Sequence, residues 1–164
     1  MNKRAAYDEL AGQLAALLAG EPDRVANSAN MAALVYHGLP DLNWAGFYFT
    51  RGGELVLGPF QGKPACVRIA WGKGVCGTAA ARGVAIVVPD VYEFPGHIAC
   101  DAASRSELVV PLLAAGRVVG VLDLDSPDLA RFDEADRAGI ERLVAIFQAH
   151  HRDWPDARAT ARRR

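Results

Sequence analysis

Hydrophobic and polar positions recur along the chain with two different periods, and the period predicts the type of each element. Leucines at positions 10, 14, 17 and 18 have helical spacing and predict a helix over residues 7–19, which Gly20 ends. After a Glu-Pro start signal, a second helix is predicted over residues 23–37. The period then shortens to two, which predicts β-strands from residue 43 onward.

The middle of the chain has the pattern of an antiparallel meander. NWAGFYFTR and ELVLGPFQG predict two strands joined by a Gly-Gly turn, and residues 65–70 predict a third, short strand. GVCGTAAARG predicts a small helix, AIVVPD a brief strand, and SELVVPLLAAGRVVGVLDLDS a hairpin that turns near Ala115 and Gly116. FDEADRAGIERLVAIFQAH predicts a final amphipathic helix capped by Asp133. This order predicts an α+β domain whose antiparallel sheet is covered by helices, with a pocket between the sheet and the loops around the small helix.

Length and composition indicate one globular domain. We expect residues 1–154 of the 164-residue chain to form it and the basic residues 155–164 to be a solvated, disordered tail. A hydrophobic share of 51% and a charged share of 23% are typical of soluble proteins, and a net charge of −1 gives no field that would attract nucleic acid. No apolar stretch has membrane-spanning length, and the start lacks a secretory apolar core, so we expect a cytoplasmic protein.

A polar segment over residues 90–107, DVYEFPGHIACDAASRSE, separates two strongly apolar runs. A long ordered loop in a compact domain is more often functional than idle. Its one cysteine, Cys100, has His97 three residues before it and charged neighbours, which makes it a candidate nucleophile or redox thiol. From this loop alone, a half-buried cysteine in an ordinary connection is equally consistent with the sequence.

Acidic residues mark the second strand of the hairpin. Asp123 and Asp125 alternate with apolar residues, so both carboxyl groups point to one face of the sheet, and Glu107 begins the neighbouring strand within reach of Asp125. We therefore predict an acidic pocket, rather than a solvated strand end, in which at least one carboxyl group has a raised pKa. Such a cluster suits an ammonium group, a metal ion or a proton donor. Mg²⁺ or Ca²⁺ is the rival interpretation, although no spaced loop of oxygen ligands is present.

Two further residue types are candidates for the same pocket. Alternation places Trp44 and Tyr48 on one strand face; ordinary core packing explains either residue, whereas Gly46 between them weakly favours a pocket wall. Cys76 lies near the start of the small helix, where the helix dipole lowers a thiol pKa, so it competes with Cys100 as nucleophile. A small residue packed between helix and sheet is the favoured interpretation of Cys76. Three cysteines in a reducing compartment argue against a structural disulfide framework, and the absence of a closely spaced pair among them argues against zinc.

The strings NWAGFYF, GPFQGKPACVRI, GKGVCGTAAA, VPDVYEFPGHIACDAASRSE and GVLDLDSP resemble free methionine-(R)-sulfoxide reductase, a GAF-domain enzyme family. The resemblance spans residues 43–132, and the flanking helices fit the same domain. It implies a GAF-like fold and reduction of free L-methionine-(R)-sulfoxide rather than of residues within proteins. Ala70 and Trp71 depart from the family pattern, and we expect them to change the pocket rim slightly.

The resemblance also implies roles for individual residues. Cys100 matches the catalytic cysteine and Cys66 the favoured resolving cysteine, whereas Cys76 belongs to the pattern with a less settled redox role. The acids matching the substrate site are Glu107, Asp123 and Asp125, with Glu107 and Asp125 also candidates for catalysis; Trp44 matches the aromatic wall, to which Tyr48 on the same face is added. The family is dimeric, uses neither a metal nor an organic cofactor, and is reduced by thioredoxin. The alternative functions are a GAF module that binds a small ligand for signalling, and a thiol redox sensor without turnover.

Overall fold

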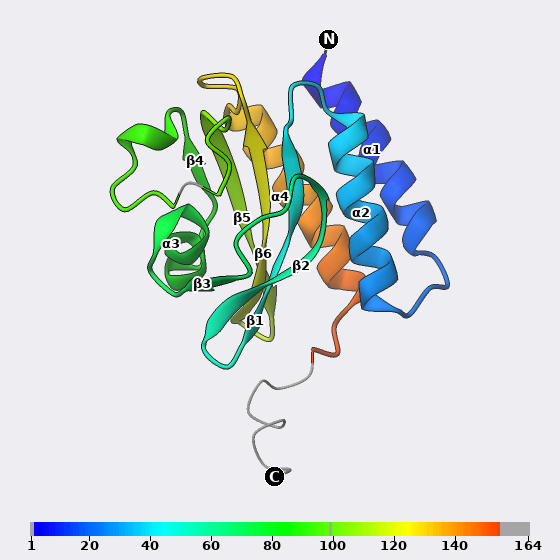
Figure 1. The fold of residues 1–164 in the computed structure, drawn as a ribbon. Coiled ribbons are helices and arrows are strands. Elements are labelled where there is room, and N and C mark those ends of the chain that lie inside the picture. Colours follow the sequence, from blue (N-terminus) through cyan, green and yellow to red (C-terminus); the bar gives the residue numbers. More distant parts are fainter. Residues whose placement is uncertain (1, 99, 155–164) are drawn as a thin grey trace.

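The computed structural model describes residues 2–98 and 100–154. Four α-helices, six strands and one short 3₁₀ turn follow one another along this part of the chain (Figure 1). In order they are α1 (Lys3–Leu18), α2 (Arg24–Gly38), β1 (Trp44–Arg51), β2 (Glu54–Gly62), β3 (Arg68–Ala70), α3 (Gly74–Arg82), β4 (Ile86–Val88), the 3₁₀ turn (Val91–Glu93), β5 (Ser106–Ala114), β6 (Arg117–Ser126) and α4 (Glu134–His150).

The six strands form one antiparallel sheet in the order β3-β2-β1-β6-β5-β4. The predicted hairpins β1–β2 and β5–β6 supply its two halves. These halves meet where β1 pairs with β6, from Trp44 opposite Asp125 to Phe49 opposite Gly120, so these two strands lie at the centre of the sheet. The α+β prediction is therefore confirmed.

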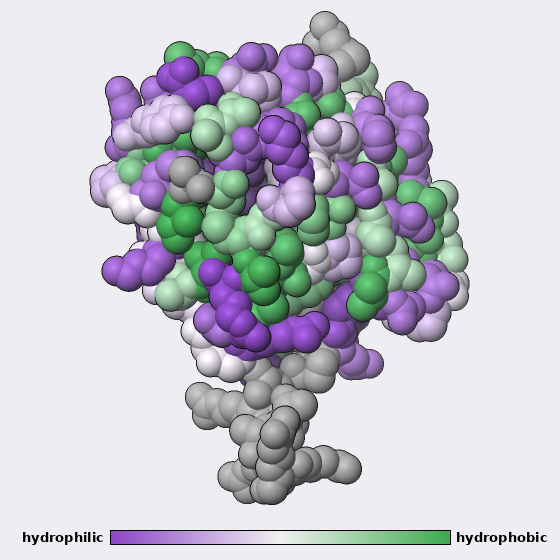
Figure 2. All heavy atoms as spheres, viewed as in Figure 1, coloured by the Kyte–Doolittle hydropathy of each residue, from purple (hydrophilic) through white to green (hydrophobic). Residues whose placement is uncertain are grey.

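Helices cover both faces of this sheet (Figure 1). The long helices α1, α2 and α4 lie on one face, whereas α3 and the segment after β4 lie on the other. Each face has its own apolar core, because alternate residues of every strand point in opposite directions. Phe47 and Phe49 pack toward the three long helices, and Trp44 and Tyr48 pack toward α3. In Figure 2, polar residues cover much of the surface, and hydrophobic residues gather in one area low on the visible face.

The helix ends show why these segments are helical. Asp133 and Asp136 form a reciprocal capping box at the start of α4, as the Asp133 prediction requires. Helix α3 ends at Gly83, whose φ of 65° is a left-handed conformation that glycine adopts without a steric penalty. Helix α1 begins at Lys3 rather than at residue 7, because the Asn2 side chain accepts a hydrogen bond from the Arg4 amide and caps the helix earlier.

The third strand differs from its prediction in a way that matters for the site. Strand β3 comprises only Arg68–Ala70, so Cys66 lies before the strand, in an irregular segment. The Cys66 carbonyl accepts a hydrogen bond from the Tyr48 hydroxyl at 2.9 Å. This hydrogen bond holds the segment that carries Cys66 against the sheet face.

The predicted loop over residues 90–107 is partly regular structure. It starts with the 3₁₀ turn, and its last two residues, Ser106 and Glu107, already belong to β5. The Val91 amide donates to the Arg105 carbonyl at 2.9 Å, which brings the two ends of the loop together. Cys100 therefore lies in a loop whose two ends are joined by a backbone hydrogen bond.

Within residues 2–98 and 100–154, no helix is long and apolar enough to cross a membrane. The predicted basic tail over residues 155–164 lies outside the described residues.

Candidate functional site

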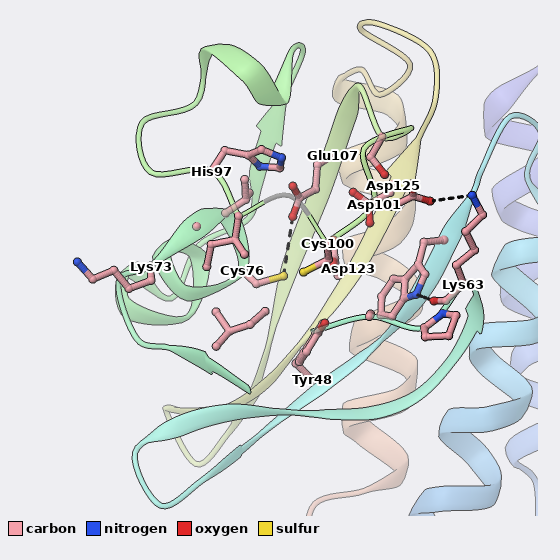
Figure 3. Close-up of a pocket in the computed structure, with 18 residues that line it drawn as sticks. Tyr48, Lys63, Lys73, Cys76, His97, Cys100, Asp101, Glu107, Asp123 and Asp125 are labelled. Carbon is pink, nitrogen blue, oxygen red and sulfur yellow. Dashed lines mark hydrogen bonds and ion pairs between the residues drawn. The ribbon is translucent and has the colours of Figure 1, made fainter. Parts of the chain in front are cut away.

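A pocket opens between the sheet face that carries Trp44 and the segment that includes α3 and the loop after β4 (Figure 3). This is the position predicted from the element order. Its lining includes all the predicted site residues except Cys66: Trp44, Tyr48, Cys76, Cys100, Glu107, Asp123 and Asp125. Five separate elements or loops contribute them, so the fold assembles a site from residues that are distant in sequence.

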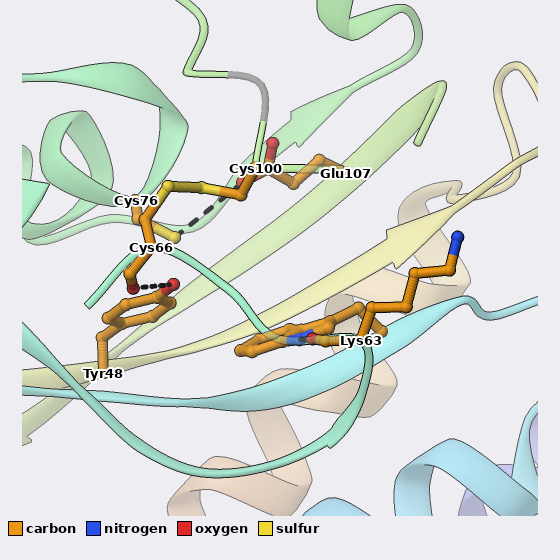
Figure 4. Close-up of a disulfide and its surroundings, with 7 residues drawn as sticks. Tyr48, Lys63, Cys66, Cys76, Cys100 and Glu107 are labelled. Atoms are coloured by element: carbon orange, nitrogen blue, oxygen red, sulfur yellow. Dashed lines mark hydrogen bonds between the residues drawn. A yellow bond between two sulfur atoms is a disulfide. The ribbon is translucent and has the colours of Figure 1, made fainter. Parts of the chain in front are cut away.

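Cys66 and Cys100 form a disulfide at the mouth of this pocket (Figure 4). Their Cα atoms are 5.7 Å apart although 34 positions separate them in the sequence. Cys100 is exposed and Cys66 is half-buried. A disulfide that joins two irregular segments at the surface can be reached by an external dithiol. The pairing implied by the family resemblance is therefore the pairing that the structure contains.

Three carboxyl groups lie below the disulfide on strands β5 and β6. Glu107 pairs directly with Asp125 across the two strands, and Trp44 pairs with Asp125 from the other side. Asp123, two residues before Asp125, faces the same way and lies between Gly46 and Val109. The predicted sharing of one sheet face and the predicted reach of Glu107 to Asp125 are both confirmed by this register.

Burial changes the acidity of these groups. Glu107 and Asp123 are each only 6% exposed. Burial, followed by the charges of Asp123 and Asp125, raises the pKa of Glu107 well above its ordinary value. Burial also raises the pKa of Asp125, and it raises the pKa of Asp123 to about 6. The predicted rise in the pKa of at least one clustered carboxyl group is therefore confirmed, and a raised pKa suits a carboxyl group to donate a proton.

Cys76 is the free thiol of the chain, and it is buried against the sheet. Its sulfur lies 3.8 Å from Glu107 Oε1. Burial and the neighbouring acids Asp123 and Glu107 raise the pKa of the thiol. The prediction that the helix dipole would lower this pKa is wrong, because the apolar surroundings and the carboxyl groups oppose the thiolate more strongly. The favoured interpretation of Cys76 as a packed residue is confirmed, although the same side chain also lines the pocket.

Aromatic rings form the wall opposite α3. The Trp44 ring stacks on Phe60 at a centroid distance of 5.3 Å and on Tyr48 at 5.9 Å. A Cβ at Gly46 would lie 2.6 Å from the Trp44 ring and 2.3 Å from the Phe60 Cβ. The missing side chain lets Trp44 and Phe60 pack over the Gly46 backbone, and Trp44 and Tyr48 both line the pocket, so the interpretation of this face as a pocket wall is confirmed.

Sequence reasoning missed two polar residues at the pocket mouth. The Lys63 carbonyl accepts from the Trp44 indole at 3.1 Å, and the Lys63 ammonium lies 3.9 Å from the Asp101 carboxylate. The first contact ties the segment that carries Cys66 to β1, and the second links it to the loop that carries Cys100. Lys63 belongs to the GPFQGKPACVRI string, which places it near Cys66 in the sequence but does not indicate its contacts with Trp44 and Asp101.

Side chains that are far apart in the sequence meet at the base of the pocket. The ligand-type atoms of Cys76, Glu107 and Asp123 lie within 4.8 Å of one another, a proximity that the spacing of the cysteines in the sequence does not indicate. His97 also lines the pocket, and partial burial lowers its pKa.

The chain is similar in sequence and in structure to known proteins. The GAF domain profile matches residues 23–148. Protein YtsP of Bacillus subtilis is 58% identical over 90% of this chain and 91% of its own length, and the free methionine-R-sulfoxide reductase of Escherichia coli is 53% identical over 90% of each chain. The structure of free methionine-R-sulfoxide reductase from Neisseria meningitidis in complex with its substrate superimposes with a TM-score of 0.90 at 45% identity, covering 98% of this chain and 95% of that one. The chain therefore belongs to the GAF-domain family, and within it to the free methionine-(R)-sulfoxide reductases.

Proposed function

We propose that this protein reduces free L-methionine-(R)-sulfoxide to L-methionine with cysteine thiols as the source of electrons. The observation that carries the proposal is the Cys66–Cys100 disulfide at the mouth of a pocket with three carboxyl groups below it. The E. coli and N. meningitidis relatives, which bear the name of this activity, support the choice of substrate.

The acidic residues explain why the substrate would be a free amino acid. A free methionine sulfoxide carries an ammonium group, and a residue within a protein does not. Burying a carboxylate without a counter-charge is unfavourable, so Glu107, Asp123 and Asp125 favour a ligand that brings a cation. Trp44 and Tyr48 supply an apolar surface for the S-methyl group. We assign the ammonium to these carboxylates and the methyl group to this wall.

Cys100 is assigned as the nucleophile because it is exposed at the pocket mouth. In the reduced protein its thiolate attacks the sulfoxide sulfur while the sulfoxide oxygen takes up a proton. We assign this proton to Glu107 or Asp125, because burial raises the pKa of both carboxyl groups. The sulfoxide oxygen is transferred to Cys100, which becomes a sulfenic acid, and methionine leaves.

Cys66 is assigned as the resolving thiol. It attacks the sulfenic acid sulfur, the disulfide forms, and the oxygen leaves as water. The oxidised state with this bond is the state that the structure contains. An external dithiol then returns both cysteines to thiols by exchange. We propose thioredoxin for this step, a homodimer as the assembly and the cytoplasm as the compartment; no resident cofactor is assigned.

One assay tests the activity. The purified protein is mixed with a thioredoxin regenerating system or with dithiothreitol, and reductant consumption is followed with and without free methionine-(R)-sulfoxide. Continuous consumption only in the presence of the sulfoxide, with equal production of methionine, is the expected result. One equivalent consumed per protein, regardless of sulfoxide, would instead identify a thiol redox sensor. Sulfoxide binding without consumption would identify a GAF sensor module.

A further inference from the structure

Hydrophobic side chains are exposed beside the disulfide. Figure 2 shows such residues gathered on the part of the visible face where Figure 1 places β3 and α3. Three large ones belong to the segments next to the two cysteines. Val67 directly follows Cys66, Trp71 directly follows β3, and Ile98 lies two positions before Cys100. Their exposed fractions are 61%, 36% and 40%, and we call these three side chains the apolar patch.

The apolar patch is small enough for one partner protein to cover. Strand β3 is three residues long, so Val67 and Trp71, which flank it, lie about 13 Å apart at the rise of a strand. Ile98 packs on the start of α3, where a Cβ built at Gly74 would lie 3.2 Å from the Ile98 side chain. A standard interface covers about 800 Å² on each partner, roughly 30 Å across. A protein partner centred on the disulfide therefore also covers the apolar patch.

The substrate pocket does not account for Val67 and Trp71. Among the described residues, neither side chain lines the pocket, and neither packs in one of the two apolar cores. Trp71 departs from the family pattern, and this departure lies outside the substrate pocket. A tryptophan exposes a large apolar area, and this residue type is enriched among those that dominate protein interfaces. The two side chains therefore fit a contact with a partner better than a contact with the substrate.

The chemistry of the disulfide defines the partner. Each turnover of the proposed reaction leaves the Cys66–Cys100 bond, and an external thiolate must attack it to restore the thiols. Cys100 is the exposed member of the pair, so the incoming sulfur forms a bond with Cys100 while Cys66 leaves as a thiolate and takes up a proton. The second thiol of the donor then displaces Cys100, which also takes up a proton, and closes the donor's own disulfide. The donor thereby loses the two electrons that the cysteine pair gains.

We propose that Val67, Trp71 and Ile98 form the docking surface for a protein dithiol, which is a folded protein that carries its two thiols beside an apolar contact face. Figure 3 shows Lys73, at the start of α3, extending away from the pocket, and this charge favours a donor with an acidic group at the edge of that face. The inference rests on the proposed function, because the proposed reaction makes the disulfide a recurring substrate of the donor. A small dithiol reaches the sulfur atoms without covering the apolar patch, so the two kinds of donor can be distinguished.

The test compares a protein donor with a small donor on the same oxidised protein. The protein is oxidised with diamide, and thiol titration under denaturing conditions checks that Cys76 is its one remaining thiol. Reduction of the disulfide is followed without sulfoxide, once with reduced thioredoxin and once with dithiothreitol. Trp71→Ala should lower the rate constant with thioredoxin at least about fivefold and leave that with dithiothreitol unchanged, because only the protein donor contacts the apolar patch. Trp71→Phe should restore most of the loss.

A matched pair of valines supplies the control. Val67→Ala should also slow reduction by thioredoxin alone, whereas Val25→Ala should change neither rate, because Val25 is 63% exposed on α2, which covers the opposite face of the sheet. Three results would each overturn the proposal: equal losses with both donors, wild-type rates in Trp71→Ala and Val67→Ala, or a wild-type rate constant no higher with thioredoxin than with dithiothreitol. Because no sulfoxide is present, a protein that failed the reductase assay would still give a result here, and the two failures are distinguishable.

Discussion

The buried carboxyl group of Asp123 should make the free protein less stable as the pH rises. Its pKa is about 6 in the folded protein, against an ordinary value of 3.8. A carboxyl group with a raised pKa binds its proton more tightly in the folded state than in the unfolded state. Its contribution to stability is therefore fully present below about pH 4 and is lost as the pH rises through about 6. The perturbation that isolates this effect is Asp123→Asn, which is neutral at every pH.

The size of the effect follows from the shift. About two pKa units at 1.36 kcal/mol each correspond to about 3 kcal/mol of folding free energy lost between pH 4 and pH 7. Asp123 is 6% exposed, so solvent screening does not reduce this value greatly. The charge of Asp123 also contributes to the raised pKa values of Glu107 and Asp125. Removing that charge should lower both, which increases the advantage of the variant at high pH.

Urea denaturation of the oxidised protein at a series of pH values measures the effect. The quantity of interest is the free energy of unfolding of Asp123→Asn minus that of wild type, because groups that Asp123 does not influence cancel. This difference should grow by about 3 kcal/mol from pH 4 to pH 7 and then level off. Asp128→Asn, which changes an exposed aspartate after β6, is the control and should give a constant difference. A constant difference for Asp123→Asn as well would refute the reasoning.

Cys100→Ser should abolish turnover even with excess reductant, because a hydroxyl is far less acidic than a thiol, whose pKa is about 8.5; wild-type-like activity in a steady-state assay would promote Cys76 to nucleophile. Cys66→Ser should release about one methionine per subunit in a rapid-quench experiment and then cycle slowly with thioredoxin. A peptide map of protein oxidised by substrate that shows a Cys76–Cys100 bond would exchange the roles of the two partners. N-acetyl-methionine-(R)-sulfoxide should be a poor substrate, because it lacks the ammonium group. Asp125→Asn and Glu107→Gln should each lower kcat/KM more than about tenfold. Equal turnover of the acetylated compound would show that the pocket does not bind the ammonium group of the substrate.

The local pattern of the sequence determined the elements and the direction of their side chains. Strict alternation in GVLDLDS could place Asp123 and Asp125 on one face, because a strand repeats every two residues whatever surrounds it. The hairpin turn at Ala115 and Gly116 fixed the proximity of Glu107 to Asp125 in the same way. Capping signals were equally local, which is why the start of α4 was predictable at Asp133.

Only the tertiary structure decided what lies beside these faces. The contact between Cys66 and Cys100 spans 34 positions, and the family resemblance indicated it, whereas no periodicity did. The acidity of Cys76 was predicted in the wrong direction, because the helix end is a local feature and the burial against Glu107 and Asp123 is not. The pocket wall beside Gly46 was indicated by the sequence, but the pattern of this strand could not show that Phe60 of the neighbouring strand packs over the glycine. Burial and pairing between distant segments depend on how the whole chain packs, and the sequence pattern of one segment does not show which other segments pack against it.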